Sequence, residues 1–134
     1  MKDSYIFEKA TICRLPGNVV VVLPYQHVIK QKNDLVYIGT DTDSGTIWGI
    51  MRNLEVIVEP IYNALGPCEN GMIAFKQGNK WGYMNEKCEV VIPAKYVTAC
   101  NFQYDIAKVA IFNGREFYID KRGRKLKTDD DEDY

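Results

Sequence analysis

The sequence feature that most constrains the fold is an internal repeat. Residues 48–60 and residues 81–93 share one pattern, in which a Trp-Gly pair is followed by Val and Ile and then by a Pro twelve positions after the Trp. The two copies lie 33 positions apart. A repeat of this length indicates small supersecondary units that bury their apolar faces against one another.

Weaker copies of the pattern lie on both sides of this pair. The same twelve-residue spacing leads back from Pro24 to Ile12, although the Trp-Gly pair is missing there. Residues 115–123 form a fourth copy, with Glu116 at the Trp position, which stops near Leu126 before any Val-Ile-Pro run. We therefore predict four units of about 34 residues, at residues 4–34, 35–70, 71–104 and 105–126.

Each unit has the pattern of three strands. In chain order, each unit has a leading apolar strand, a turn with Gly or Asn, an aromatic strand, a polar turn and a Val/Ile strand ended by Pro. Helical periodicity is absent over any useful length. The expected fold is all-β, an antiparallel meander of four three-stranded units. Residues 19–23 could pair within their own unit or with the last one, so the array is either open or closed into a barrel or propeller-like form.

Length and charge suggest one domain with an appended tail. The 134 residues include 46% hydrophobic residues, so we expect a single β-repeat domain over residues 1–127. Five of the 18 acidic residues lie in residues 128–134, and the rest of the chain keeps 17 basic and 13 acidic residues. We expect a disordered acidic tail, with partner binding by the tail as the alternative, which a pull-down with and without residues 128–134 would test.

The cysteines and the hydropathy suggest an intracellular protein without a cofactor. No segment is an apolar run of membrane-spanning length or a signal peptide, so we expect a cytoplasmic protein with no membrane partner. Cys13, Cys68, Cys88 and Cys100 form no C-x-x-C pair, and His27 is the sole histidine. This spacing predicts reduced thiols, no metal site and no cofactor.

The strongest copy has a motif that resembles a known family. Residues 80–83 are Lys-Trp-Gly-Tyr, Gly71 begins the leading strand, residues 91–93 are Val-Ile-Pro and Tyr96 follows. These residues resemble the WG repeat, also described as KWG-like. The resemblance extends over about residues 35–126.

The resemblance implies a β-rich bacterial repeat module that mediates interactions, and it brings no catalytic residues. Copy two keeps Trp48-Gly49 and a Pro-Ile-Tyr run, whereas copy four keeps Tyr118 but has lost the Trp-Gly pair. Because terminal units of repeat arrays must tolerate water, we interpret units one and four as caps.

Strand geometry explains the Trp-Gly motif. Side chains alternate along a strand, so Trp81 and Tyr83 should share one face, and Gly82 should let a neighbouring strand or ring approach its backbone on the other. In the fourth copy Phe117 fills the Gly position. We expect this change, with the Glu before it, to be an adaptation of the end of the array.

The search for catalytic groups favours structural explanations. His27 has no evident Ser, Asp or Cys partner at a repeat-equivalent position, so we favour a structural or exposed histidine over a general base. Cys88 occupies the turn position of Gly123, and thiolate catalysis there is disfavoured. Asp41 and Asp43 lie in a turn where acids are common, without the distal Glu of a calcium loop. A small enzyme that uses His27 or an exposed Cys remains an alternative.

The leading functional hypothesis is a noncatalytic protein-interaction module with an unknown protein partner, which it scaffolds or neutralises. The second is single-stranded nucleic-acid binding through the basic body, including residues 121–127, and the aromatic side chains. Binding of nucleic acid would weaken with added salt, because phosphate contacts release counterions.

The interpretation of Trp81 as a core residue makes a testable prediction. Trp81→Ala should lower the free energy of unfolding by about 3–5 kcal/mol, as truncation of a core aromatic does. Chemical denaturation measures this change. A variant as stable as the parent would contradict the core position of Trp81.

Overall fold

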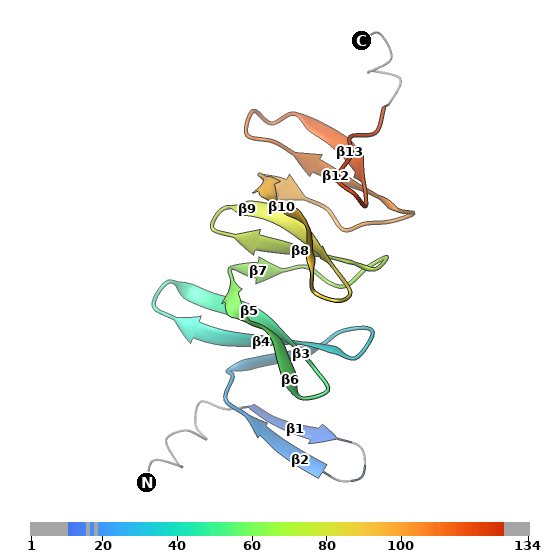
Figure 1. Cartoon of the computed structure of the whole chain (residues 1–134). Helices are drawn as coiled ribbons and strands as arrows, with labels where there is room; N and C mark the ends of the chain where they lie inside the picture. The colour runs from blue at the N-terminus through green and yellow to red at the C-terminus, as the bar shows by residue number, and fades with distance from the viewer. Residues whose placement is uncertain (1–10, 16, 18, 128–134) are drawn as a thin grey trace. The chain divides into compact units, whose positions relative to one another are not determined.

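The computed structural model describes residues 11–15, 17 and 19–127, and every regular element in these ranges is a β-strand (Figure 1). The expected acidic tail, residues 128–134, lies outside the described residues. No helix within the described ranges is long and apolar enough to cross a membrane. The prediction of an all-β chain is confirmed for this part of the sequence.

Thirteen strands follow one another in the described residues. They are β1 (Thr11–Leu15), β2 (Val19–Leu23), β3 (His27–Lys30), β4 (Leu35–Thr42), β5 (Gly45–Arg52), β6 (Glu55–Tyr62), β7 (Ala64–Leu65), β8 (Met72–Gln77), β9 (Lys80–Asn85), β10 (Val90–Tyr96), β11 (Thr98–Ala99), β12 (Ile106–Ala110) and β13 (Glu116–Asp120).

These strands form four sheets in which neighbours along the chain are neighbours in space. One sheet pairs β1 with β2, a second has the order β3-β4-β5-β6, a third has the order β10-β9-β8-β7, and the last has the order β11-β12-β13. The strand pairs are antiparallel. The predicted antiparallel meander is therefore confirmed within each sheet.

The expected division into four three-stranded units is wrong in its strand count. A short strand that follows each Pro-containing segment pairs with the next hairpin: β3 pairs with β4, β7 with β8 and β11 with β12. The sheets therefore have two, four, four and three strands. Strands as short as β7, which has two residues, leave no alternating pattern in the sequence, so the pairing shifts the unit boundaries without a visible signal.

Closure into a barrel is also not observed. Residues 19–23 form β2, which pairs with β1 from Thr11↔Leu23 to Leu15↔Val19, so this strand completes its own hairpin. None of the four sheets formed by the described strands closes on itself. The sequence allowed either an open array or an array closed into a barrel or propeller-like form, and each of these sheets is open.

The chain forms two compact units, one through Ile61 and one that begins at Tyr62. A single β-repeat domain over residues 1–127 stays a prediction. In the first unit, Leu23, Ile38 and Met51 form a buried cluster, against which half-buried side chains such as Tyr25 and Val56 pack. The second unit holds the copy with the most complete motif, and the fold is described there in detail.

The Gly of the Trp-Gly pair lies where another strand crosses its backbone. A Cβ placed on Gly82 would lie 2.8 Å from the Ala94 nitrogen of β10 and 2.8 Å from the Phe75 ring. At Gly49 a Cβ would lie 2.7 Å from the Pro60 nitrogen of β6. Side chains essentially never come this close, so the predicted role of this glycine is confirmed in both copies.

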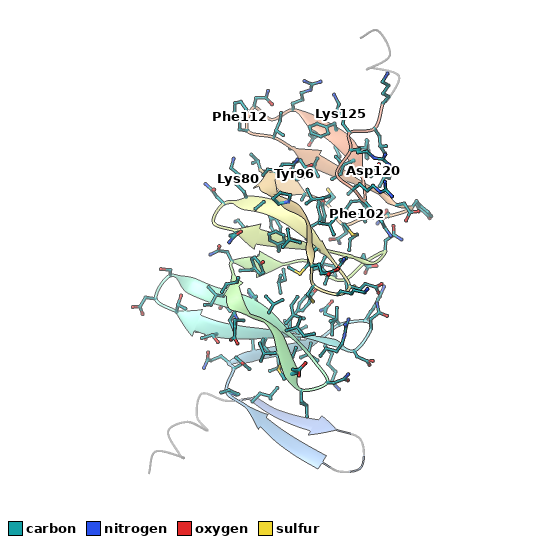
Figure 2. The ribbon with its side chains drawn as sticks, viewed as in Figure 1. Lys80, Tyr96, Phe102, Phe112, Asp120 and Lys125 are labelled. Atoms are coloured by element: carbon teal, nitrogen blue, oxygen red, sulfur yellow. The ribbon has the colours of Figure 1, made fainter. Side chains whose placement is uncertain are left out.

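The core of the second unit lies between the third sheet (β7–β10) and the last sheet (β11–β13). Met72, Ala74 and Tyr83, on one face of the third sheet, cluster with side chains from one face of the last sheet. The buried members contributed by the last sheet and the loop before it are Phe102, Ala107, Val109 and Ile119. Figure 2 labels Phe102 together with Tyr96, another aromatic ring of this cluster.

The expected position of Trp81 is only partly correct. Trp81 packs against the same cluster as Tyr83, as strand alternation predicts, but it is half-buried whereas Tyr83 is fully buried. The cost of Trp81→Ala should therefore fall near the lower end of the expected range, about 3 kcal/mol.

The crossing at Gly82 gives a prediction with a matched control. Gly82→Ala should lower the free energy of unfolding by about 1–3 kcal/mol or more, because a methyl group overpacks a site bounded by backbone atoms. Gly66→Ala is the control, since a Cβ there would meet the Asn101 side chain at 3.3 Å and Ala74 Cβ at 3.4 Å. Urea denaturation should show a larger loss for Gly82→Ala than for Gly66→Ala, and equal losses would contradict the crossing.

Candidate functional site

The last two sheets are built in the same way, which allows their faces to be compared position by position. Gly66 donates a backbone hydrogen bond to Ala74, and Cys100 donates the equivalent bond to Lys108, at 2.7 and 2.9 Å. The bridge between Glu69 and Met72 has its counterpart 34 residues later, between Gln103 and Ile106. The turns after β9 and β13 also match. The backbone amide of Asn85 donates a hydrogen bond to the Glu89 carbonyl oxygen, and the amide of Asp120 donates the equivalent bond to Arg124.

One face of the third sheet is covered, whereas the equivalent face of the last sheet is not. Met72 and Tyr83 are 5% and 0% exposed beneath the last sheet. Their counterparts on the last sheet, Ile106 and Tyr118, are 38% and 40% exposed. We call this surface, which carries Ile106, Lys108, Glu116 and Tyr118, the open face.

Two substitutions adapt the open face to water. Lys108 stands at the position of Ala74, and Glu116 stands at the position of Trp81. The Lys108 ammonium lies 3.0 Å from the Glu116 carboxylate, and this hydrogen bond raises the pKa of Lys108. An ion pair thus stands where the third sheet has an indole, and the interpretation of unit four as a cap stays a prediction.

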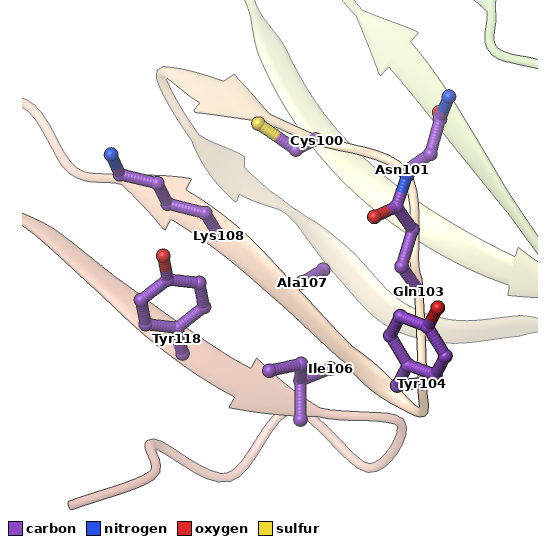
Figure 3. Close-up of a pocket in the computed structure, with 8 residues that line it drawn as sticks. All are labelled: Cys100, Asn101, Gln103, Tyr104, Ile106, Ala107, Lys108 and Tyr118. Atoms are coloured by element: carbon purple, nitrogen blue, oxygen red, sulfur yellow. The ribbon is translucent and has the colours of Figure 1, made fainter. Parts of the chain in front are cut away.

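A shallow pocket of about 390 Å³ lies on this side of the last sheet. Figure 3 shows that Lys108 and Tyr118 extend side by side from neighbouring strands, and that Tyr104 lies at the turn that leads into β12. The pocket is lined by Cys100, Asn101, Gln103, Tyr104, Ile106, Ala107, Lys108 and Tyr118. Two phenol rings, two amides, an aliphatic side chain and a cation thus border one concave surface, a composition suited to recognition.

Tyr104 is the most unusual residue of this surface. Its side chain is 93% exposed, and its backbone φ is 51°, in the left-handed region that bulky residues seldom occupy. The equivalent position one repeat earlier holds Asn70, with a φ of 54°. The chain thus holds an exposed tyrosine ring on a strained turn, where the preceding copy has the better-suited Asn.

On the third sheet, where the equivalent face is covered, Tyr83 makes contacts that Tyr118 lacks on the open face. Tyr83 Oη donates a hydrogen bond to the Cys100 carbonyl oxygen at 2.5 Å, and its ring meets Phe102 edge to face at a centroid distance of 4.8 Å. Burial, followed by the nearby Cys100 and Tyr96, raises the pKa of Tyr83 far above its ordinary value. Tyr118 presents the same phenol at the uncovered position.

In the first unit, the structure gives His27 a partner that sequence reasoning missed. His27 Nε2 lies 2.8 Å from Asp41 Oδ1, because the pairing of His27 with Gly39 brings the strand that carries Asp41 alongside. Thr46 donates a hydrogen bond to the same carboxylate oxygen at 2.7 Å, and this bond, more than the one to His27, lowers the pKa of Asp41. The imidazole also lies against the Trp48 ring, at a centroid distance of 5.6 Å.

This constellation does not amount to a nucleophile and its base. The Thr46 hydroxyl is bonded to the carboxylate and not to the imidazole, whereas base activation requires a hydrogen bond between nucleophile and base. Both side chains of the His27–Asp41 contact are about half exposed, at 43% and 55%. Asp41 was not evident as a partner from the repeat-equivalent positions, and the arrangement is that of a surface hydrogen-bond network.

The cysteines of the second unit differ in burial, since Cys68 is buried, Cys88 is half-buried and Cys100 is exposed. Cys88 and Gly123 both have a positive φ, of 65° and 83°, so their predicted equivalence in the turn is confirmed. Cys100 lies at the pocket. In the part of the chain that the structure describes, no three His, Cys, Asp or Glu side chains group to hold a metal ion.

Intrachain contacts engage several side chains of the basic run. Arg124 Nε lies 2.7 Å from Asp120, and Lys121 Nζ lies 3.2 Å from Asp105. The Lys125 ammonium lies 5.4 Å from the centre of the Phe117 ring. These contacts compete with phosphate binding by the same cations.

Sequence reasoning did not find the open face. The fourth copy of the repeat does contain a pattern that indicates this face: Tyr118 keeps the position of Tyr83, whereas the Val-Ile-Pro strand is absent. Tyr104 could not be found in this way, because neither its backbone conformation nor its exposure follows from a strand pattern.

Comparisons with known proteins agree with the repeat architecture. The family model described as WG containing repeat matches residues 52–81 and again residues 81–114. The search of curated proteins and the search of solved structures each returned no significant match.

The two equivalent tyrosines provide a matched pair for mutation. Tyr83→Phe should lower the free energy of unfolding by about 1–2 kcal/mol, because it removes a buried hydrogen bond and leaves a carbonyl unsatisfied. Tyr118→Phe, on the open face, should change stability by less than about 0.5 kcal/mol. Equal costs measured by chemical denaturation would contradict the difference in burial between the two faces.

Alkaline titration also tests the burial of Tyr83, by comparing the parent with Tyr83→Phe. Because the pKa of Tyr83 is raised in the folded state, the protein should lose stability as pH rises above about 10, where the unfolded tyrosine ionises. Tyr83→Phe should lose less stability than the parent does as pH rises above the ordinary tyrosine pKa of about 10.

Proposed function

We propose that this chain, which belongs to the proteins with WG-containing repeats, is a noncatalytic protein-interaction module. It binds its partner through the open face of the last sheet. The family supports this proposal, because it indicates a repeat-type binding module. The observation that carries this proposal is the exposure of Ile106, Tyr118 and Tyr104 on a face whose equivalent one repeat earlier is buried by a β-sheet.

The chemistry of the open face favours a protein surface as the ligand. Tyrosine side chains provide large, rigid contact areas with a polar end, and they are enriched at protein interfaces. Lys108 and Glu116 neutralise each other at 3.0 Å, so the face itself has little net charge to attract a polyanion. Single-stranded nucleic acid, which needs a basic groove along its backbone, is less well matched by this surface.

The binding hypothesis also accounts for the strain at Tyr104. A non-glycine residue in the left-handed region costs about 1–3 kcal/mol, and such residues cluster at ligand sites. Tyr104→Asn, which introduces the residue found at the equivalent turn, should therefore leave the fold as stable or more stable. Loss of binding in a variant that gains stability would separate a functional role from a structural one.

Photo-crosslinking in cells that produce the protein tests the proposed function. Benzoylphenylalanine in place of Tyr104 should form a protein adduct, because the 93% exposed ring lies at the edge of the pocket. The same probe in place of Phe112, which is 82% exposed in the turn between β12 and β13, is the matched control and should not form that adduct. Figure 2 labels this position on the ribbon.

The outcome is read from the nature of the adduct. A protein adduct at position 104 that disappears when Ile106→Asp is added supports the proposal. An adduct that is removed by nuclease would favour the nucleic-acid alternative. Equal adducts from positions 104 and 112, or none from position 104, would contradict binding at the open face.

A further inference from the structure

We propose that the partner held by the open face is a second copy of this chain, docked face to face about a two-fold axis. This inference rests on the proposed function, since it names the occupant of the same surface. It follows from three observations: the equivalence of the open face to a covered face, the arrangement of its charges, and the position of Tyr104.

The equivalent face one repeat earlier shows what such a surface accepts. There, Tyr83 is covered by a sheet of the same kind, which brings an aromatic ring, Phe102, against its phenol and a carbonyl oxygen to its hydroxyl. The open face keeps the phenol, as Tyr118, and an aliphatic side chain, as Ile106. Its natural complement is therefore another β-sheet layer that carries a projecting aromatic ring.

The open face provides that ring itself. Tyr104 lies at the loop before β12, two positions after Phe102, and it borders the same pocket as Tyr118. In a two-fold interface, each patch must be complementary to itself, so that a residue i of one copy contacts j of the other and j contacts i. Tyr104 of one copy can therefore cover Tyr118 of the second copy, while the reverse contact forms on the other side of the axis.

The charges of the open face are arranged in the same self-complementary way. Lys108 and Glu116 lie 3.0 Å apart and remain 44% and 55% exposed as side chains. Two such pairs, turned about an axis between the faces, place Lys108 of each copy beside Glu116 of the other. Four alternating charges then form a closed network, whereas two faces of like charge would repel each other.

This composition indicates an association that forms and dissociates. A permanently covered layer would have Ala and Trp where the open face has Lys108 and Glu116, as the third sheet does at Ala74 and Trp81. Charged residues at the centre of an interface lower its affinity but make each separated copy tolerant of water. Such a face suits a protein that exists both as a monomer and as a dimer.

The test uses sedimentation velocity of the full chain over a concentration series, with charge reversals at the open face. Lys108→Glu and Glu116→Lys should each weaken self-association by about tenfold or more, because like charges then face each other between copies. An equimolar mixture of the two variants should regain association, since each Lys again meets a Glu across the axis. Lys87→Glu, an exposed reversal in the turn after β9, is the matched control and should associate like the parent.

Each outcome decides between the occupants. Association that is lost in both variants and regained on mixing supports the two-fold dimer. A chain that stays monomeric at all concentrations, an association that neither reversal affects, or a mixture that does not recover would overturn it. The thermal melt of each variant verifies that the variants remain folded.

The crosslinking probe at position 104 separates this inference from the proposed function. An adduct of twice the chain mass supports the second copy. An adduct with a different protein at the same position overturns the dimer but leaves the open face as a protein-binding surface. Absence of any position-specific adduct contradicts both.

Discussion

The close approach of a strand to the backbone of Gly82 is the constraint on which the second unit depends. Since β10 crosses where a side chain would otherwise lie, the strand is held against β9 although its ladder is irregular on both sides of Ile92. The crossing carries Ile92 and Tyr96 into the buried cluster between the third and last sheets. A glycine at this position therefore determines both the edge of one sheet and part of the core that covers its face.

The last sheet shows what happens when this device is lost. Phe117 occupies the Gly position, and its ring packs into the cluster and meets Tyr96 edge to face at a centroid distance of 6.4 Å. Among the residues described after β13, a bridge at Lys125 and a hydrogen bond from Leu126 to Tyr118 stand in place of a full strand. The same sheet thus contributes one face to the buried cluster and presents a mixed polar and aromatic surface on the other.

The first unit offers a contrast to that surface. His27, Asp41 and Thr46 form a connected hydrogen-bond network beside Trp48, but these bonds satisfy the carboxylate and leave no hydroxyl activated by the imidazole. The open face has the opposite character, since its phenol and aliphatic groups have equivalents that are buried elsewhere in the same chain. Recognition is therefore better supported at the open face than chemistry is at the histidine.

The sequence by itself determined the all-β class, the twelve-residue spacing from Trp to Pro and the role of Gly82, because alternation along a strand and the steric demand of a crossing are local properties. It also marked the fourth copy as altered, through Glu116 and Phe117. Only the tertiary structure decided that a two-residue strand such as β7 joins the following hairpin, that β2 pairs with β1, and that Asp41 reaches His27. Strand pairing over such distances depends on which backbone groups meet, and that information is not contained in the pattern of any single strand. The open face belongs to this second class, since the exposure of Tyr118 and the burial of Tyr83 differ although their local sequences are alike: one is covered by a neighbouring sheet and the other is not.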